Sequence, residues 1–94
     1  MNALSVELEP ARHRWVARLP AGEAEIVYAP VADGVVELQH TYVPPAARGD
    51  HVGDALVRAV LADIRARGWR ARVTCPYVGA WLRRHPEARD VVVP

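Results

Sequence analysis

The stretch from Val35 to Gly68 constrains this chain most, because it passes from a strand pattern to a helix pattern through one short loop. Residues 35–43 (VVELQHTYV) are rich in β-branched and aromatic residues and predict a largely buried strand. The two prolines at 44 and 45 cannot donate backbone hydrogen bonds, so they end strand pairing there. A helical pattern follows the loop at residues 48–53 and stops at Gly68.

The loop at residues 48–53 leads directly into a helix N-terminus, where backbone N–H groups have no intrahelical partner. The helix dipole adds partial positive charge at this end, so an anion such as a phosphate is favoured. The same residues also fit an ordinary helix start in which Asp50 caps the first turn. The predicted anion contacts are Arg48, Gly49, Asp50, His51, Val52 and Gly53.

The rest of the chain predicts an α+β fold that begins with an antiparallel four-stranded meander. Apolar and polar residues alternate in short segments, which are separated by turns containing proline or glycine. A fifth strand after the long helix is expected to lie parallel to the fourth, because a helix connects the two. The predicted strands are residues 5–9, 14–19, 24–29, 35–43 and 69–75, followed by a short helix over 77–84 and a last edge strand over 90–93.

Composition limits the classes of function. With 94 residues, 51% of them hydrophobic, the chain is expected to form one domain over residues 1–94. A formal net charge of +1 gives no strong attraction to nucleic acid or to a membrane surface. No apolar run approaches the roughly 18 residues that span a bilayer, so we expect a soluble, cytoplasmic protein. The single cysteine and four dispersed histidines show no metal-ligand spacing, and no metal site is predicted.

The segments described above resemble the GCN5-related N-acetyltransferase (GNAT) superfamily. The acetyl-CoA pyrophosphate loop of that family reads Gln/Arg-x-x-Gly-x-Gly/Ala. Arg48 takes the first position of this pattern and Gly53 the last, while His51 stands where the family has its middle glycine. The segments HTYVPP at 40–45, CPY at 75–77 and RHP at 84–86 resemble the short single-domain GNAT-like proteins of the YjdJ type.

The resemblance implies that acetyl-CoA is a cosubstrate and that an amine accepts the acetyl group. In GNAT folds the fourth and fifth strands part and the pantetheine arm pairs with the fourth, which places Thr41 and Val43 at those backbone contacts. A histidine at position 51 narrows the space for the diphosphate, yet can also donate to it. Few residues lie between the first two strands, so the acceptor cleft would be shallow. This favours a peptide or protein amine, or a homodimer that completes the cleft.

Two residues of the fourth strand are candidates for catalysis. Glu37 lies four residues before Thr41, which resembles the position of the general base in GCN5-like enzymes, and it equally fits the solvated face of the sheet. His40 is a second candidate, and it also fits a hydrogen-bonded position at the margin of the core. Simple alternation places Glu37 and His40 on opposite sides of the strand unless a bulge intervenes.

Two further candidates lie around the fifth strand. Cys75 precedes a helix N-terminus, where the dipole favours a thiolate that could accept the acyl group, but a lone strand cysteine also fits a small buried apolar residue. The tyrosine that often protonates the CoA thiolate in this family falls on Arg84, and Tyr77 could replace it from a neighbouring turn. Two functions therefore stand open: an N-acetyltransferase, acting directly or through Cys75, and a catalytically silent CoA-binding or protein-interaction module.

Overall fold

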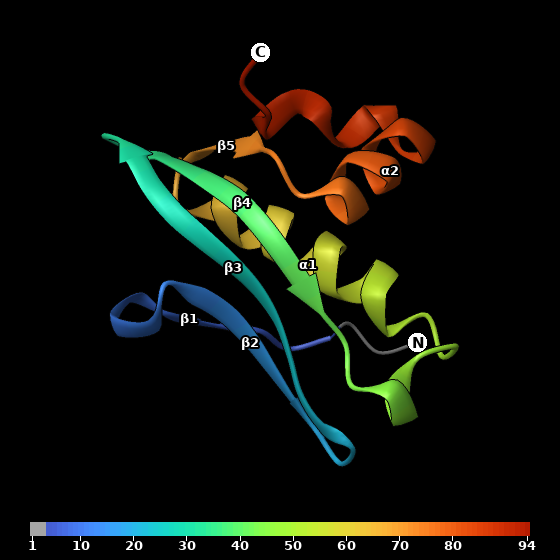
Figure 1. The fold of residues 1–94 in the computed structure, drawn as a ribbon. Coiled ribbons are helices and arrows are strands. Elements are labelled where there is room, and N and C mark those ends of the chain that lie inside the picture. The colour runs from blue at the N-terminus through green and yellow to red at the C-terminus, as the bar shows by residue number, and fades with distance from the viewer. Residues whose placement is uncertain (1–3) are drawn as a thin grey trace.

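A five-stranded sheet in the order β1-β2-β3-β4-β5 forms the scaffold of the protein in a computed structural model that describes residues 4–94 (Figure 1). Residues 1–3 of the predicted domain lie outside the described part. The first four strands are antiparallel and β5 is parallel to β4, which confirms the predicted α+β fold. The elements are β1 (Glu7–Glu9), η1 (Pro10–Arg12), β2 (Arg14–Leu19), β3 (Gly22–Ala32), β4 (Val35–Tyr42), η2 (Pro45–Ala47), α1 (Val52–Ala66), β5 (Arg70–Val73), α2 (Pro76–Arg84) and η3 (Pro86–Val91).

Both α-helices share one apolar core with one face of the sheet. Trp15, Ile26 and Leu38, from three successive strands, have no exposed surface, and neither does Leu56 of α1. Trp81 of α2 belongs to the same core and is 1% exposed. The alternation of strand residues and the 3.6-residue period of α1 produce this arrangement, because each directs its apolar side chains to one side.

Among residues 4–94, the helices lack the length and the apolar composition that a membrane-spanning helix requires.

The C-terminal segment differs from the prediction. Residues 86–91 form the 3₁₀-helix η3, and only an isolated bridge between Ala71 and Val92 remains of the edge strand predicted over 90–93. Pro86 fits the first turn of a helix, because its missing N–H needs no partner there. The prediction was wrong because the run of valines favours a strand, whereas the segment packs on α1 and α2 instead.

The strands β4 and β5 part half-way along β4. Their parallel register runs from Val35 opposite Arg70 to Leu38 opposite Val73, and β4 continues to Tyr42 without β5. The carbonyl oxygen of Leu38 accepts hydrogen bonds from the backbone N–H groups of residues 74 and 75, at 3.1 and 3.0 Å, as the chain turns away. Within residues 4–94, the last four residues of β4 therefore have no strand beside them on this side.

A β-bulge in β4 lies at the point where β5 leaves. His40 pairs with Val27 of β3 and Leu38 pairs with the next residue, Tyr28, so Gln39 is the extra residue. Glu37 pairs with Ala29, two residues from Val27, and therefore lies on the same face of the sheet as His40. The bulge thus unites the two candidate residues that simple alternation separates. Their shared face is the one opposite the core, because Tyr28 and Leu38 are core residues.

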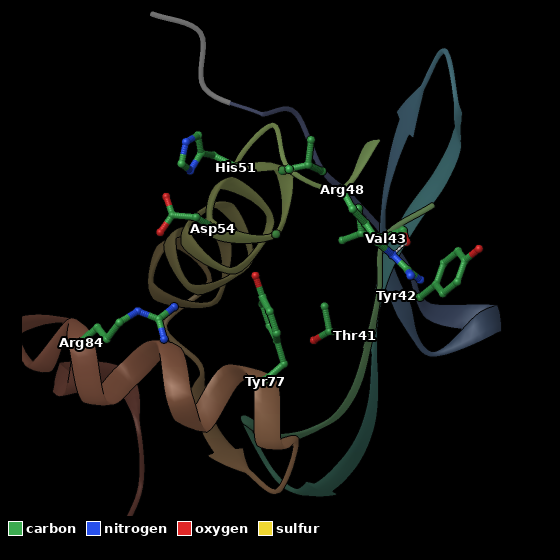
Figure 2. Close-up of a pocket in the computed structure, with 11 residues that line it drawn as sticks. Thr41, Tyr42, Val43, Arg48, His51, Asp54, Tyr77 and Arg84 are labelled. Atoms are coloured by element: carbon green, nitrogen blue, oxygen red, sulfur yellow. Dashed lines mark hydrogen bonds between the residues drawn. The ribbon is translucent and has the colours of Figure 1, made fainter. Parts of the chain in front are cut away.

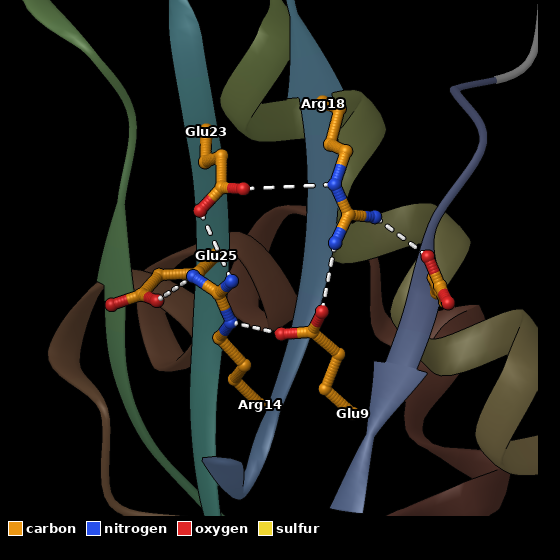
Figure 3. Close-up of polar contacts among 6 residues, drawn as sticks. Glu9, Arg14, Arg18, Glu23 and Glu25 are labelled. Atoms are coloured by element: carbon orange, nitrogen blue, oxygen red, sulfur yellow. Dashed lines mark hydrogen bonds and ion pairs between the residues drawn. The ribbon is translucent and has the colours of Figure 1, made fainter.

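The face of the sheet opposite the helices carries a network of ion pairs (Figure 3). Arg14, only 8% exposed, contacts three carboxylates from β1 and β3: Glu9 at 2.6 Å, Glu25 at 2.9 Å and Glu23 at 3.0 Å. Arg18 lies beside it and pairs with Glu7 and Glu9. Hydrogen bonds to Glu25 and Glu9 raise the pKa of Arg14 further above its usual range, so this guanidinium stays charged.

Candidate functional site

A pocket of about 550 Å³ lies where β4 extends beyond β5, between the end of β4, the loop after it, the first turn of α1 and the helix α2 (Figure 2). It brings together seven of the eight predicted cofactor contacts, Asp50 being the exception, and one predicted catalytic residue, Tyr77. Tyr42 and Asp54 line the pocket as well, although no sequence pattern predicts them as site residues. The lining residues are Thr41, Tyr42, Val43, Arg48, Gly49, His51, Val52, Gly53, Asp54, Tyr77 and Arg84.

The start of α1 has unpaired backbone donors on the pocket side. The first helical hydrogen bond runs from Ala55 N–H to the His51 carbonyl oxygen, at 3.0 Å. The N–H groups of Val52, Gly53 and Asp54 precede this bond and have no partner within the helix. No side chain in the described part of the chain caps the helix, and the N-cap position belongs to His51, so the interpretation of Asp50 as N-cap is wrong. The pocket therefore has the donors that an oxyanion needs.

His51 adopts a left-handed backbone conformation, with φ 59° and ψ 21°. Glycine takes this conformation without steric cost, which gives a physical reason for the glycine of the family pattern. The imidazole of His51 is exposed, and Figure 2 shows it directed outward from the rim of the pocket. The side chain therefore leaves the space between β4 and α1 open.

Gly53 allows α2 to touch the first turn of α1. A Cβ atom at this position would lie 2.1 Å from the hydroxyl oxygen of Tyr77, closer than non-bonded atoms approach. The Tyr77 side chain, 44% exposed, points from α2 toward α1 in Figure 2. Its hydroxyl therefore lies beside the unpaired N–H groups at the start of α1, in the gap left by the parted strands.

Asp54 links α1 to α2 at the rim of the pocket. Its Oδ1 accepts a hydrogen bond from the indole Nε1 of Trp81 at 2.6 Å. Arg58 lies 3.6 Å from the same oxygen, and the Nε2 of His85, whose ring stacks on Trp81, lies at 3.9 Å. The Trp81 hydrogen bond, which outweighs partial burial, lowers the pKa of Asp54, and Arg58 contributes in the same direction. This carboxylate is therefore ionised and fixed in position near neutral pH.

The side chain of Arg48 folds back over the end of β4. Its Nε donates to the carbonyl oxygen of Val43 at 2.8 Å, and its guanidinium carbon lies 5.8 Å from the centre of the Tyr42 ring. The carbonyl oxygen of Val43 therefore already has a donor. Arg84, at the opposite wall of the pocket, makes only a weak 3.4 Å contact to the Ala80 carbonyl oxygen, so its charge is available to a ligand.

The three other candidate catalytic residues do not line the pocket. Cys75 is 3% exposed, and its Sγ lies 3.4 Å from the hydroxyl of Thr41, which does line it. The thiol therefore lies directly behind the pocket wall. Glu37 accepts a hydrogen bond from Gln39 at 2.9 Å on the opposite face of the sheet, which it shares with the exposed His40. Within residues 4–94 no group of three or more histidine, cysteine or acidic side chains is arranged to hold a metal ion.

Comparison with known proteins identifies the family. A model of the GCN5-related N-acetyl-transferase family matches residues 14–91, which include the pocket and most of the core. The chain belongs to this family. Protein NATD1 from Bos taurus is 33% identical over 85 residues, which are 88% of this chain and 75% of the relative. Protein NATD1 from Homo sapiens is 31% identical over 85 residues, with the same shares.

A solved structure supports the GNAT fold independently. The NMR solution structure of a GCN5-like protein from Staphylococcus aureus aligns with a TM-score of 0.68 over 99% of this chain and 91% of that one. At 21% sequence identity this similarity concerns the fold alone. Together with the family match, it confirms the resemblance inferred from the loop and the strand before it.

Proposed function

We propose that this GNAT protein binds acetyl-CoA in the pocket between β4, α1 and α2 and transfers the acetyl group to an amine. The observation that supports this most directly is the parting of β4 and β5 beside a helix start with unpaired N–H groups. GNAT proteins generally use acetyl-CoA as cosubstrate, and acetyl-CoA is available in the cytoplasm, where we expect the protein to act as a single domain.

The residues of the pocket fit the parts of this cosubstrate. The N–H groups of Val52, Gly53 and Asp54 are the proposed donors to the diphosphate, and Arg84 adds positive charge. Gly49, with φ 94°, allows the loop to turn toward the helix without steric strain. The free edge of β4 near Thr41 is the proposed partner of the pantetheine arm.

Acetyl transfer to an amine requires a base for the amine proton and a proton donor for the leaving thiolate. Attack of the amine nitrogen on the thioester carbonyl breaks the carbon–sulfur bond, and the leaving thiolate needs a proton. Tyr77 is the proposed donor, because its hydroxyl reaches into the gap beside the start of α1. Glu37 or His40 would remove the amine proton only from an acceptor that approaches the opposite face of the sheet, where both residues lie.

Transfer through Cys75 is the second mechanism. Its thiolate would displace CoA from the acetyl group, and the amine would then displace the thiolate from the resulting thioester. Because Cys75 is 3% exposed and lies behind Thr41, we favour direct transfer. Mass spectrometry of the protein during turnover distinguishes the two, since only the second adds an acetyl group to Cys75.

The proposed acceptor is a peptide or protein amine. Only the 3₁₀-helix η1 (Pro10–Arg12) and His13 lie between β1 and β2, so little chain is available there to enclose a small metabolite. A second copy of the chain could complete the cleft, which makes a homodimer the alternative arrangement.

A catalytically silent CoA-binding or protein-interaction module is the second candidate function. It is favoured by Arg84 at the position of the family's proton-donating tyrosine, and by the carbonyl oxygen of Val43, which Arg48 already occupies. Binding of acetyl-CoA without acetyl transfer to any amine is the result that this function predicts.

Calorimetric titration with acetyl-CoA tests the proposal. We expect saturable binding to the wild type, and its loss in a Gly53→Leu variant, because a side chain at this position enters the pocket. Gly79→Ala is the matched control, since a Cβ there meets no atom within 4 Å and Gly79 lies outside this pocket. Absence of binding to the wild type would refute the cosubstrate assignment. Release of CoA thiol with amine-containing peptides then distinguishes the enzyme from the silent module.

A further inference from the structure

A second pocket, of about 360 Å³, lies between β5, α2 and the C-terminal segment, which Figure 1 shows together at one end of the molecule. Three arginines from three different elements line it: Arg72 of β5, Arg83 of α2 and Arg89 of η3. Leu82 and Val92 are among its apolar lining residues, and none of the lining residues that the structure describes has an acidic side chain. The pocket therefore combines positive charge with an aliphatic wall.

The arginines of this pocket lack the partners that other arginines of the chain have. Arg65 pairs with Asp90 at 2.7 Å and Arg67 with Asp63 at 2.8 Å. Arg72 comes no closer than 3.9 Å to Glu37, and within the described residues neither Arg83 nor Arg89 forms an ion pair or a side-chain hydrogen bond. Like charges gathered around one pocket repel one another, and a bound anion would remove that repulsion.

Gly79 is an independent indication that this pocket is kept open. It lies inside α2, where glycine weakens a helix relative to alanine, and it lines the pocket. Crowding does not explain it, because a Cβ atom at this position would meet no atom within 4 Å. Its backbone conformation does not require glycine either, since its φ is not positive. The absence of a side chain at position 79 leaves the pocket wall open.

We propose that this second pocket binds an oxyanion carried on a short aliphatic body, either a carboxylate or a phosphate monoester. Arg83 and Arg89 are the proposed partners of the oxyanion, because the structure leaves their guanidinium groups unpaired. Leu82 and Val92 are the proposed contacts of the aliphatic part, and Gly79 provides the space for it. The site is separate from the pocket at the start of α1 and does not depend on acetyl-CoA binding.

Nuclear magnetic resonance titrations that follow the Gly79 amide and the arginine Nε–H signals test this site. The probes are sodium hexanoate, monohexyl phosphate, inorganic phosphate and the neutral 1-hexanol. We expect saturable shifts at Gly79 with hexanoate or monohexyl phosphate, and whichever binds more tightly identifies the source of the oxyanion. Binding should weaken at least tenfold in an Arg83→Gln/Arg89→Gln variant. It should be lost in Gly79→Leu, where the arginine Nε–H signals report it in place of the glycine amide. Arg12 is exposed and lies outside both pockets, so Arg12→Gln should leave binding unchanged.

Several results would overturn the proposal. If neither hexanoate nor monohexyl phosphate gives saturable shifts at Gly79, no anion site exists there. The same conclusion follows if 1-hexanol binds as tightly as these two anions. Inorganic phosphate binding as tightly as monohexyl phosphate would exclude the aliphatic contacts. Unchanged binding in Gly79→Leu would exclude this pocket even if the double arginine variant failed to fold. Acetyl-CoA binding is monitored separately at the Gly53 amide, so failure of either site is recognised on its own.

Discussion

The ion-pair network on the outer face of the sheet and the pocket at the end of β4 use polar groups in opposite ways. On the outer face, two arginines and four glutamates contact one another, and Arg14 alone pairs with three carboxylates. In the pocket, the N–H groups at the start of α1 have no partner within the helix, and Arg84 makes one weak contact.

The difference indicates where stability and where ligand binding reside. Polar groups that satisfy one another contribute to folding and have little left to offer a ligand, whereas unpaired donors at a helix start contribute little to folding and can bind an anion. We therefore expect changes in the network to alter stability without altering acetyl-CoA affinity. Changes in the pocket should alter acetyl-CoA affinity without altering stability. Asp54 is the exception: it lines the pocket and also joins α1 to α2, so its replacement should alter both.

Replacing Arg14 by methionine should have the largest effect on stability. The substitution leaves Glu9, Glu23 and Glu25 close together without their shared cation. These carboxylates are partly exposed, so the expected cost is that of losing hydrogen bonds between charged groups, about 1.5–3 kcal/mol. Urea unfolding measures this loss. Acetyl-CoA affinity measured by calorimetry should stay within twofold of the wild type, and a larger change would break the separation between network and pocket.

Arg18→Met is the matched control for that experiment. Arg18 carries the same charge in the same network, but its side chain is 53% exposed, and solvent screens exposed ion pairs so that they contribute little to stability. We expect the loss of stability in Arg18→Met to be well below that in Arg14→Met. Equal losses would mean that burial does not decide the contribution of these arginines.

Asp54→Ala should have the second largest effect, and it should act on both properties. It leaves the indole N–H of the buried Trp81 without an acceptor, which costs about 1–2 kcal/mol of unfolding free energy. Asp54→Asn keeps an acceptor oxygen and should retain most of the stability. If the bond between α1 and α2 sets the shape of the pocket, acetyl-CoA affinity falls in Asp54→Ala and is preserved in Asp54→Asn. Tighter binding in both variants would instead show that the carboxylate repels the diphosphate.

The strands, both helices and the loop that forms the pocket could be predicted from the sequence, because their signals are local. Alternation in residues 5–9 and the proline pair at 44 and 45 act on their immediate neighbours, and Gly68 follows the helix end in the left-handed conformation, with φ 72°. The bulge at Gln39 has no such signal. It depends on the register with β3, and it is what places Glu37 and His40 on one face.

The contacts that complete the site could not be predicted, because they join distant parts of the chain. Asp54 and Trp81 are 27 residues apart, and the sequence alone does not determine how α1 and α2 are rotated against each other. The contact between Tyr77 and Gly53 has the same character. Gly53 in the loop pattern indicates that space is needed at this position, but the sequence does not show that the side chain of Tyr77 occupies that space.

The lowered pKa values of Asp54 and Asp63 should make stability depend on pH, and we expect this effect to be smaller than those of Arg14→Met and Asp54→Ala. Burial raises the pKa of Asp63, but the hydrogen bonds from Trp15 and Arg67 outweigh burial, so the pKa of Asp63 is lowered. The hydrogen bond from Trp81 lowers the pKa of Asp54. A lowered folded-state pKa contributes stability that is fully present above the usual value, near 3.8, and is lost as the pH falls through the folded-state value. Urea unfolding between pH 6 and pH 2 should therefore show stability falling below about pH 4. The fall should be shallower in Asp63→Asn, and an unchanged pH profile would contradict the role of the Trp15 bond.

Gly53→Ala should have the smallest effect on stability but should clearly weaken acetyl-CoA binding. It is therefore the most direct test of whether stability and ligand binding reside in different regions. The new methyl group would meet the hydroxyl oxygen of Tyr77 at 2.1 Å and the ring carbon that bears it at 2.9 Å, both at the free end of a half-exposed side chain that can rotate away. We therefore expect the free energy of unfolding to change by less than about 1 kcal/mol, while acetyl-CoA affinity falls because the methyl group narrows the donor site. The double variant Gly53→Ala/Tyr77→Phe removes the hydroxyl, which makes the shorter of these two contacts, and should recover part of any lost stability but not the affinity. Full recovery of affinity in the double variant would mean that Tyr77, rather than the start of α1, limits access to the pocket.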